Sequence, residues 1–347
     1  MHTVLLNRRY PAMLVASALI VCGTLAADAG AAHSSGGSIA FSRYRFVNSP
    51  LREEIWTIRL DGSGARQITH AAADYVDINP DWAPDRSKLL FTRCAPVNGQ
   101  SHEGRCTLWV VDADGTGARQ LSPSCTTAVG PTCPDDSVGR YSADGRKIAF
   151  ARYNGEPGIA ISDENLQHVH TLFPFGDRKG APDINGLAWS PDGKQLAFTV
   201  HNDNGTTVKP VGGRAVFIIG TDGTGLRRLT PWQLRADQEL DWSPDGTRIL
   251  FRTVTVASDD PGPSWGDLYT VATDGTSLIR LTHFGTTGVQ LGSYSPDGTK
   301  IVFTTQAGAT RPPAGQTWPD VFTIDADGTH LTHLTHTRNW EGTPTWR

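Results

Sequence analysis

Several features are scarce or missing in this chain, and each absence narrows the class of protein. Lys and Arg number 31 against 35 Asp and Glu, the formal net charge is −4, and no basic run is present. Proteins that bind nucleic acid usually carry a basic patch or run, so we expect no nucleic acid partner. Beyond residue 32 no segment is apolar enough to span a bilayer, so we expect no transmembrane segment in the mature chain.

The long apolar stretch near the N-terminus has the layout of a secretory signal peptide. A basic region with Arg8 and Arg9 is followed by an apolar stretch and then by small residues. This pattern predicts a signal peptide over residues 1–32 and therefore an exported protein, periplasmic or extracellular. A transmembrane anchor and a lipoprotein attached at Cys22 are the alternatives.

Cysteine is scarce, and its count bears on how the exported chain is cross-linked. Four of the five cysteines would remain after export: Cys94, Cys106, Cys125 and Cys133. An even number in an oxidising compartment favours two disulfides, for which three connectivities exist. We favour Cys94–Cys106 and Cys125–Cys133, because each pair would close one loop between predicted strands. A zinc site that includes His102 is the alternative, although the spacing lacks a C-x-x-C pair.

A repeated phrase dominates the rest of the sequence. "AWSPDGKQLAFT" begins at Ala188, "DWSPDGTRILFR" at Asp241 and "SYSPDGTKIVFT" at Ser293, with looser copies from Asp81 and Arg140. The short apolar segments predict buried strands, and S-P-D-G between them predicts a tight turn. Pro pre-sets φ for such a turn, Asp accepts a local backbone N–H, and Gly tolerates a positive φ. Each copy therefore predicts a β-hairpin.

A second hairpin phrase alternates with the first and brings the number of strands in each unit to four. It contains a D-G turn, as in "LYTVATDGTSLIRLT" from Leu268. The phenylalanines that end one strand of each unit recur about every 50 residues, at Phe41, Phe91, Phe150, Phe198, Phe251 and Phe303. Self-similarity at this period is typical of an all-β fold, the β-propeller, with four antiparallel strands in each blade.

The two ends of the predicted propeller complement one another. "GGSIAFSRY", from Gly36, contains the second strand of the S-P-D-G phrase without the first, and "EGTPTWR", from Glu341, contains the first without the second. Together the two fragments would complete one blade and leave no open sheet edge. We therefore predict a six-bladed β-propeller over residues 38–347, closed by pairing of the N- and C-terminal segments in one blade.

This repeat resembles the TolB-type propeller repeat, which occurs in the periplasmic protein TolB and in the propellers of prolyl oligopeptidase relatives. The resemblance rests on the hairpin phrases quoted above and covers residues 38–347. It implies a propeller fold, and it suggests a role in the Tol–Pal envelope system. The match includes neither the α/β domain that precedes the propeller in TolB nor the hydrolase domain of the peptidase relatives.

The two faces of the predicted propeller carry different connections. Turns inside the hairpin phrases are short and uniform and share one face, here called the turn face. Connections between phrases are long and irregular and share the other, the loop face, where we expect the binding site. The candidate binding residues near the loop face are Trp232, Trp265, Trp318 and Trp340; His70, His283 and His336; and Asp77, Asp136, Asp183 and Asp237.

These candidates leave more than one interpretation open. The tryptophans could anchor a partner or stack on sugar rings, or each could pack beneath its own loop. A ring of the aspartates and histidines could bind a divalent cation or act in acid–base chemistry, but an Asp at a strand start usually caps local backbone N–H groups. We predict no metal and no cofactor. In a strand His333 and His336 would face opposite sides, which would prevent them from sharing a metal.

No segment supplies an activated nucleophile together with its base. "GPSWG" at residues 262–266 spells G-x-S-x-G, but it lacks the preceding strand and following helix of a nucleophile elbow. We therefore predict a monomeric binding module whose partner is another envelope or extracellular protein, with carbohydrate as the other ligand considered. The alternative function is a polysaccharide-acting lyase or hydrolase with a His/Asp site at the channel mouth, and a purely structural envelope protein is a third.

Overall fold

The computed structural model describes residues 37–44, 52–95, 104–124, 133–154, 156–174, 184, 186–202, 213–254, 266–284, 288–305 and 318–347. The chain divides into two compact units, Met1–Ser35 and Gly36–Arg347, and every described residue belongs to the second. The predicted signal peptide lies outside the described residues, as do His102, Cys125, Asp183 and Trp265. No helix of the described part is long and apolar enough to cross a membrane.

The fold is all-β, as predicted, and four of its sheets contain four strands each. The first holds β8 (Asp136–Tyr141), β9 (Lys147–Arg152), β10 (Gly158–Asp163) and β11 (His170–Pro174). The second holds β12 (Leu187–Trp189), β13 (Gln195–Asn202), β14 (Gly213–Gly220) and β15 (Arg227–Arg228), which a 3-10 helix, η1 (Trp232–Leu234), follows. The third holds β16 (Ala236–Trp242), β17 (Arg248–Thr253), β18 (Leu268–Ala272) and β19 (Ile279–Arg280). The fourth holds β20 (Val289–Tyr294), β21 (Lys300–Thr305), β22 (Asp320–Asp325) and β23 (Thr332–His333).

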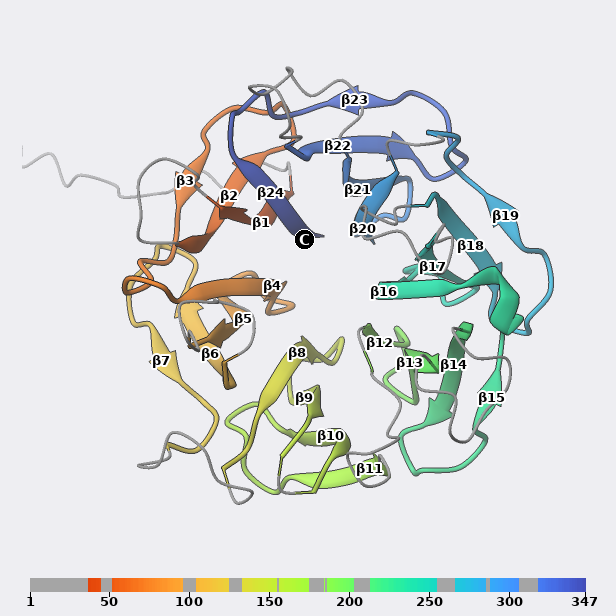
Figure 1. Ribbon diagram of the computed structural model, residues 1–347, viewed down its shortest axis with the longest axis horizontal. Helices are drawn as coiled ribbons and strands as arrows, with labels where there is room; N and C mark the ends of the chain where they lie inside the picture. The colour runs from red at the N-terminus through yellow and green to blue at the C-terminus, as the bar shows by residue number, and fades with distance from the viewer. Residues whose placement is uncertain are drawn as a thin grey trace, which may run out of the picture. The chain divides into compact units, whose positions relative to one another are not determined.

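The other strands form one sheet of two groups, which a single parallel bridge between Glu53 and Val76 joins. One group holds β4 (Val76–Trp82), β5 (Lys88–Cys94), β6 (Cys106–Asp112) and β7 (Arg119–Gln120). The other holds β24 (Trp340–Trp346), β1 (Ser38–Tyr44), β2 (Glu53–Arg59) and β3 (Arg66–Gln67). β24 pairs antiparallel with β1, so strands from the two ends of the described chain share one sheet. In Figure 1 the sheets lie around a common centre, with β4, β8, β12, β16, β20 and β24 innermost.

The S-P-D-G turns have the chemistry that the sequence predicts. Ser190 Oγ donates a hydrogen bond to Asp192 Oδ1 at 2.7 Å, and the same oxygen accepts the Lys194 N–H at 3.0 Å. These bonds hold the pKa of Asp192 below its usual value. Gly193 completes the turn with a φ of 68°, in the left-handed region that favours glycine. Each hairpin phrase therefore folds through local contacts that do not depend on the other sheets.

The D-G turns of the second phrase contact the neighbouring sheet to different extents. A Cβ on Gly62, whose φ is 78°, would lie 2.7 Å from the backbone oxygen of Leu334. Gly223 has the same place in its own turn and a φ of 82°, but there the nearest atoms, in Leu172, would lie 3.9 Å away. The turn at Gly62 thus lies directly against the last repeat of the chain.

We expect Gly62→Ala to lower the free energy of unfolding more than Gly223→Ala does. The positive φ costs both variants about 1–2 kcal/mol. Only the first variant also forces a Cβ against a backbone oxygen, which should add about 1 kcal/mol or more. Urea denaturation followed by tryptophan fluorescence measures both losses, and equal losses would argue against the contact with Leu334.

The repeated phenylalanines fill the core between neighbouring sheets. All six of the phenylalanines singled out by the repeat are completely buried. Phe198 on β13 stacks on Phe217 of its own sheet, with ring centroids 5.8 Å apart, and lies 5.4 Å from Phe173 on β11 of the sheet before it. The hydrophobic core therefore consists of contacts between one sheet and the next.

The predicted disulfide between Cys94 and Cys106 is confirmed, and it joins the end of β5 to the start of β6. Cys133 is also disulfide-bonded. Its predicted partner, Cys125, lies outside the described residues, so that pairing stays a prediction.

Candidate functional site: a pocket at the turn face

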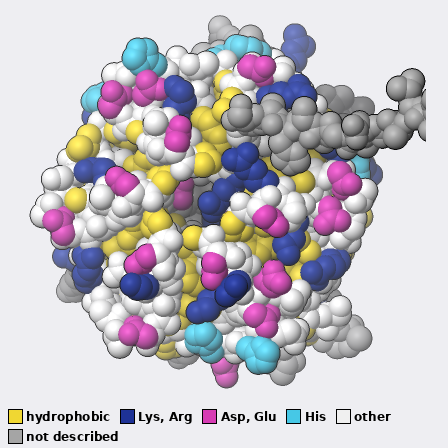
Figure 2. Space-filling view, turned by 180° about the vertical axis from the view of Figure 1, so that it is seen from behind, with side chains coloured by type: hydrophobic (Ala, Val, Ile, Leu, Met, Phe, Trp, Pro, Cys, Tyr) yellow, Lys and Arg dark blue, Asp and Glu magenta, His cyan; other side chains and the backbone are white. Residues whose placement is uncertain are grey.

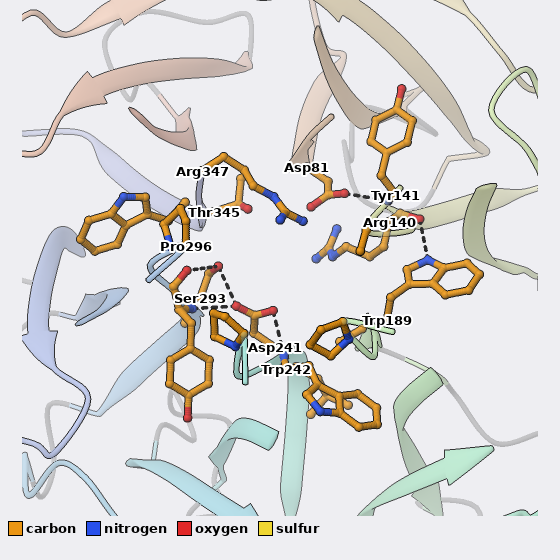
Figure 3. Close-up of a pocket in the computed structure, with 18 of the residues that line it drawn as sticks. Asp81, Arg140, Tyr141, Trp189, Asp241, Trp242, Ser293, Pro296, Thr345 and Arg347 are labelled. Carbon is orange, nitrogen blue, oxygen red and sulfur yellow. Dashed lines mark hydrogen bonds between the residues drawn. The ribbon is translucent and has the colours of Figure 1, made fainter. Parts of the chain in front are cut away.

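A pocket of about 210 Å³ lies where the innermost strands end at the turn face. Figure 3 shows its side chains converging from different sheets. Its polar lining residues include Asp81 of β4, Arg140 of β8, Asp241 of β16, Ser293 of β20, Thr345 of β24 and Arg347, which follows β24. Prolines of the S-P-D-G turns, Pro191, Pro244 and Pro296, add exposed apolar surface to the lining.

Most of these polar residues hold one position of the repeat, immediately before the aromatic residue that ends the innermost strand. Asp241, for example, precedes Trp242, and Thr345 precedes Trp346. Successive side chains of a strand point to opposite faces, so the first residue extends into the pocket, whereas the aromatic residue is buried and only borders the pocket. This position was not among the predicted site residues, although the residue there varies from copy to copy inside an otherwise uniform phrase, and that variation was a usable signal.

The two carboxylates of the pocket connect neighbouring sheets. Asp81 Oδ2 accepts the backbone N–H of Tyr141 at 2.7 Å. Asp241 Oδ2 accepts the backbone N–H of Tyr294 at 2.7 Å and the Ser293 hydroxyl at 2.9 Å. Burial raises the pKa of both carboxyl groups, and these hydrogen bonds and nearby guanidinium groups oppose that rise. Both side chains are therefore part of the scaffold as well as of the pocket.

The two arginines bring positive charge to the middle of the turn face. Figure 3 shows the guanidinium groups of Arg140 and Arg347 reaching toward the centre of the pocket beside Asp81. Both arginines are partly exposed, whereas Asp81 is buried. Within the described part of the chain, the guanidinium group of Arg347 has no hydrogen-bond partner. In Figure 2 basic side chains lie near the middle of this face.

The described candidate aspartates lie at the opposite end of the innermost strands, and two of them pair with an arginine of their own sheet. Arg93 binds Asp77 through two hydrogen bonds of 2.6 and 2.7 Å, and Arg152 binds Asp136 through two of 2.7 and 3.0 Å. The guanidinium group of Arg93 also lies 4.4 Å from the ring centre of Trp109. Such bidentate pairs fix the strands to one another.

Asp237 is surrounded by cationic and hydrogen-bonding side chains. It pairs with His201, with Arg214 at 2.7 Å and with Arg252 at 3.1 Å. Burial raises its pKa, but the His201 hydrogen bond and the two guanidinium groups outweigh burial, and the pKa of Asp237 falls to about 2. Asp237 is therefore a buried counter-ion in the folded chain.

Within the described residues, the candidate histidines form no hydrogen bond or ion pair with the candidate aspartates. His70 contacts Gln67 at 2.9 Å, and both His70 and His283 are exposed. The ring of His336 lies 3.8 Å from that of His333, centroid to centroid, so the expectation that they face opposite sides is wrong. β23 ends at His333, and strand alternation therefore does not extend to His336. Among the described residues no group of three or more His, Cys, Asp or Glu side chains could hold a metal ion.

The three described candidate tryptophans differ in exposure. Trp232 and Trp318 are buried, and Trp232 packs 5.6 Å from Phe217 in the core. Trp340 is partly exposed at the start of β24. Buried Trp232 and Trp318 present little surface to a partner, which agrees with the alternative that each packs beneath its own loop.

Glu53, at the start of β2, is a buried carboxyl group that the sequence analysis did not single out. Its Oε1 accepts the Ser42 hydroxyl at 2.6 Å. Burial raises the pKa of Glu53 to about 7, the Ser42 hydrogen bond opposes this, and the charge of Asp77 adds to it. The folded chain therefore holds a proton on Glu53 over a pH range in which the unfolded chain does not.

We expect the free energy of unfolding to decrease from about pH 5 to about pH 8 through Glu53. The stabilisation is complete below the unfolded pKa of about 4.5 and is lost as the pH rises through the folded pKa of about 7. Glu53→Gln should remove this dependence and be more stable than the wild type at about pH 8, by roughly 1–3 kcal/mol. Denaturant titrations at both pH values test this, and an unchanged pH dependence in the variant would contradict it.

Together, the all-β fold and the pocket at the ends of the innermost strands define a propeller-type domain. Residues 92–346, more than half of the chain, match the family described as the TolB beta propeller domain, and the chain belongs to that family. The family predicted from the repeat is thereby confirmed.

Three similar proteins illustrate how far the likeness extends. The Tol-Pal system protein TolB of Alcanivorax borkumensis is 30% identical over 152 residues, which cover 42% of this chain and 31% of the relative. That of Anaeromyxobacter dehalogenans is 29% identical over 191 residues, 54% of this chain and 36% of the relative. The crystal structure of TolB from Acinetobacter baumannii superposes with a TM-score of 0.63 at 19% identity, covering 89% of this chain and 66% of that one. The chain thus matches about a third of the length of these curated relatives.

Proposed function

We propose that this chain is an exported, monomeric binding module whose turn-face pocket receives part of another protein of the cell envelope or its surroundings. In this proposal residues 1–32 are a signal peptide, and residues 38–347 form a closed propeller of six blades. The pairing of β24 with β1 and the contact of the Gly62 turn with Leu334 support closure. The four-stranded groups support the blade count.

The observation that carries the binding function is the pocket itself. Innermost strands from different sheets contribute to it, and they present a residue that varies in an otherwise uniform repeat. A rigid scaffold that displays variable residues is a common basis for binding sites. The names of the relatives, which are Tol-Pal system proteins, support an envelope location and a protein partner.

A capture experiment with pocket-filling variants tests this function. Ala143 lines the pocket and is exposed, whereas Ala118 is exposed in a D-G turn outside it. Immobilised residues 33–347 are incubated with envelope extract of the source organism, and retained proteins are quantified by mass spectrometry. We expect the same protein to be retained by the wild type and by Ala118→Trp, and to be lost with Ala143→Trp.

Two results would contradict this proposal. One is retention that Ala143→Trp does not change. The other is retention that is lost with Trp340→Ala instead, because it would locate the partner at the loop face.

A further inference from the structure

We propose that the pocket binds a single carboxylate group of the partner, held by the guanidinium groups of Arg140 and Arg347. This inference rests on the proposed binding function and specifies the chemistry of its ligand. A glutamate or aspartate side chain, or a chain terminus, would supply the carboxylate.

The charged side chains near Asp81 differ in exposure, and Arg140 Nη1 already donates a hydrogen bond to the backbone oxygen of Gly139 at 3.0 Å. Asp81 is buried, and one of its oxygens is already bonded to the Tyr141 N–H. Arg140 and Arg347 are partly exposed and extend toward the centre of the pocket (Figure 3). Near Asp81, the guanidinium groups rather than the carboxylate are therefore the charged groups that a ligand would meet first.

Arginine also has the donors that a carboxylate needs. A guanidinium group has five N–H donors in a planar fork, which matches the two oxygens of a carboxylate. The Arg347 guanidinium has no hydrogen-bond partner within the described part of the chain, so its donors are available to a ligand. The side chains that face the pocket centre near Asp81 therefore favour an anion.

The other side of the pocket limits what can bind. Asp241 already accepts hydrogen bonds from Trp242 N, Tyr294 N and the Ser293 hydroxyl. It has little remaining capacity to bind a cationic ligand, and its negative charge disfavours a second carboxylate. A pocket of about 210 Å³ is smaller than the roughly 300–1,000 Å³ typical of small-molecule sites, so it fits one side chain.

The indole N–H of Trp189 is a built-in reporter for this site. It donates to the backbone oxygen of Arg140 at 3.0 Å, and Trp189 itself lines the pocket. Its ¹H–¹⁵N resonance is assigned by comparison with Trp189→Phe. The protein is titrated separately with the N-acetyl amides of glutamate, glutamine and lysine, and we expect only the glutamate compound to shift the Trp189 signal in a saturable way.

A matched pair of variants tests the assignment to arginine. Arg347→Gln should weaken binding of the glutamate compound about tenfold or more, because a charge-assisted pair is lost. Arg146→Gln removes an exposed arginine that directly follows the S-A-D-G turn and is not among the pocket residues, so it should leave the affinity unchanged. The other indole signals report whether each variant is folded.

The inference is overturned if the glutamine or lysine compound binds as well as glutamate, if none binds, or if Arg347→Gln binds glutamate normally. The capture experiment distinguishes this failure from failure of the proposed function. Lost carboxylate binding with Ala143-dependent capture intact would overturn only the arginine assignment. Saturable carboxylate binding with capture independent of Ala143 would overturn the protein-binding function.

Discussion

Glu341→Ala should lower the free energy of unfolding by about 3–5 kcal/mol. Glu341 on β24 is completely buried, and its Oε1 accepts hydrogen bonds from Arg43 Nε at 2.9 Å and Nη2 at 2.6 Å. Arg43 lies on β1, 298 residues away in sequence. Removing the carboxylate would leave the Arg43 guanidinium group without its counter-ion. The Arg43 side chain is only 8% exposed, and its uncompensated buried charge is the source of the loss.

The control for this prediction is an ion pair near the surface. Glu164 lies 3.4 Å from Lys88, and the two side chains are 45% and 27% exposed. Glu164→Ala should cost about 0–1 kcal/mol, because exposed pairs contribute little. Denaturant titrations of both variants give the comparison. Equal losses would mean that the pair joining β1 to β24 contributes no more than a surface contact.

Phe198→Ala should cost about 3–5 kcal/mol in the free energy of unfolding. The ring is fully buried and contacts Phe217 of its own sheet and Phe173 of the neighbouring sheet. Truncation would open a cavity between two sheets that are held together there by packing.

Denaturant titration measures the loss for Phe198→Ala, and two other substitutions, measured in the same way, serve as controls. Phe198→Leu, which keeps much of the volume, should lose less than half as much as the alanine variant. Leu226→Ala, at a leucine that is 46% exposed, should cost roughly 0.5 kcal/mol or less. A loss below about 1 kcal/mol for Phe198→Ala would contradict the role given to the repeated phenylalanines.

The strands and turns were predictable because their chemistry is local and is repeated. Ser190, Asp192 and Gly193 form their turn with one another, and every copy of the phrase is independent evidence for the same hairpin. The family was predictable from the same phrases. The burial of the phenylalanines likewise followed from short apolar segments that recur at the same place in every copy.

The pocket was not predictable in the same way, because its side chains meet only when the sheets assemble. Asp81 and Arg347 are far apart in the sequence, and no local pattern brings them to one place. The arginine partners of the predicted aspartates were within reach of sequence analysis, since Arg93 and Arg152 each follow a repeated phenylalanine by two positions. The error at His336 arose from extending strand alternation past the end of β23.

Site-specific photo-cross-linking in intact cells tests most directly whether the turn-face pocket is where the partner binds. p-Benzoylphenylalanine is placed at position 143, in the pocket lining, and in a second strain at position 118, which is also exposed but lies outside the pocket. The account predicts a covalent adduct with one envelope protein from position 143 and none from position 118. Adducts from position 118 with none from position 143 would contradict it.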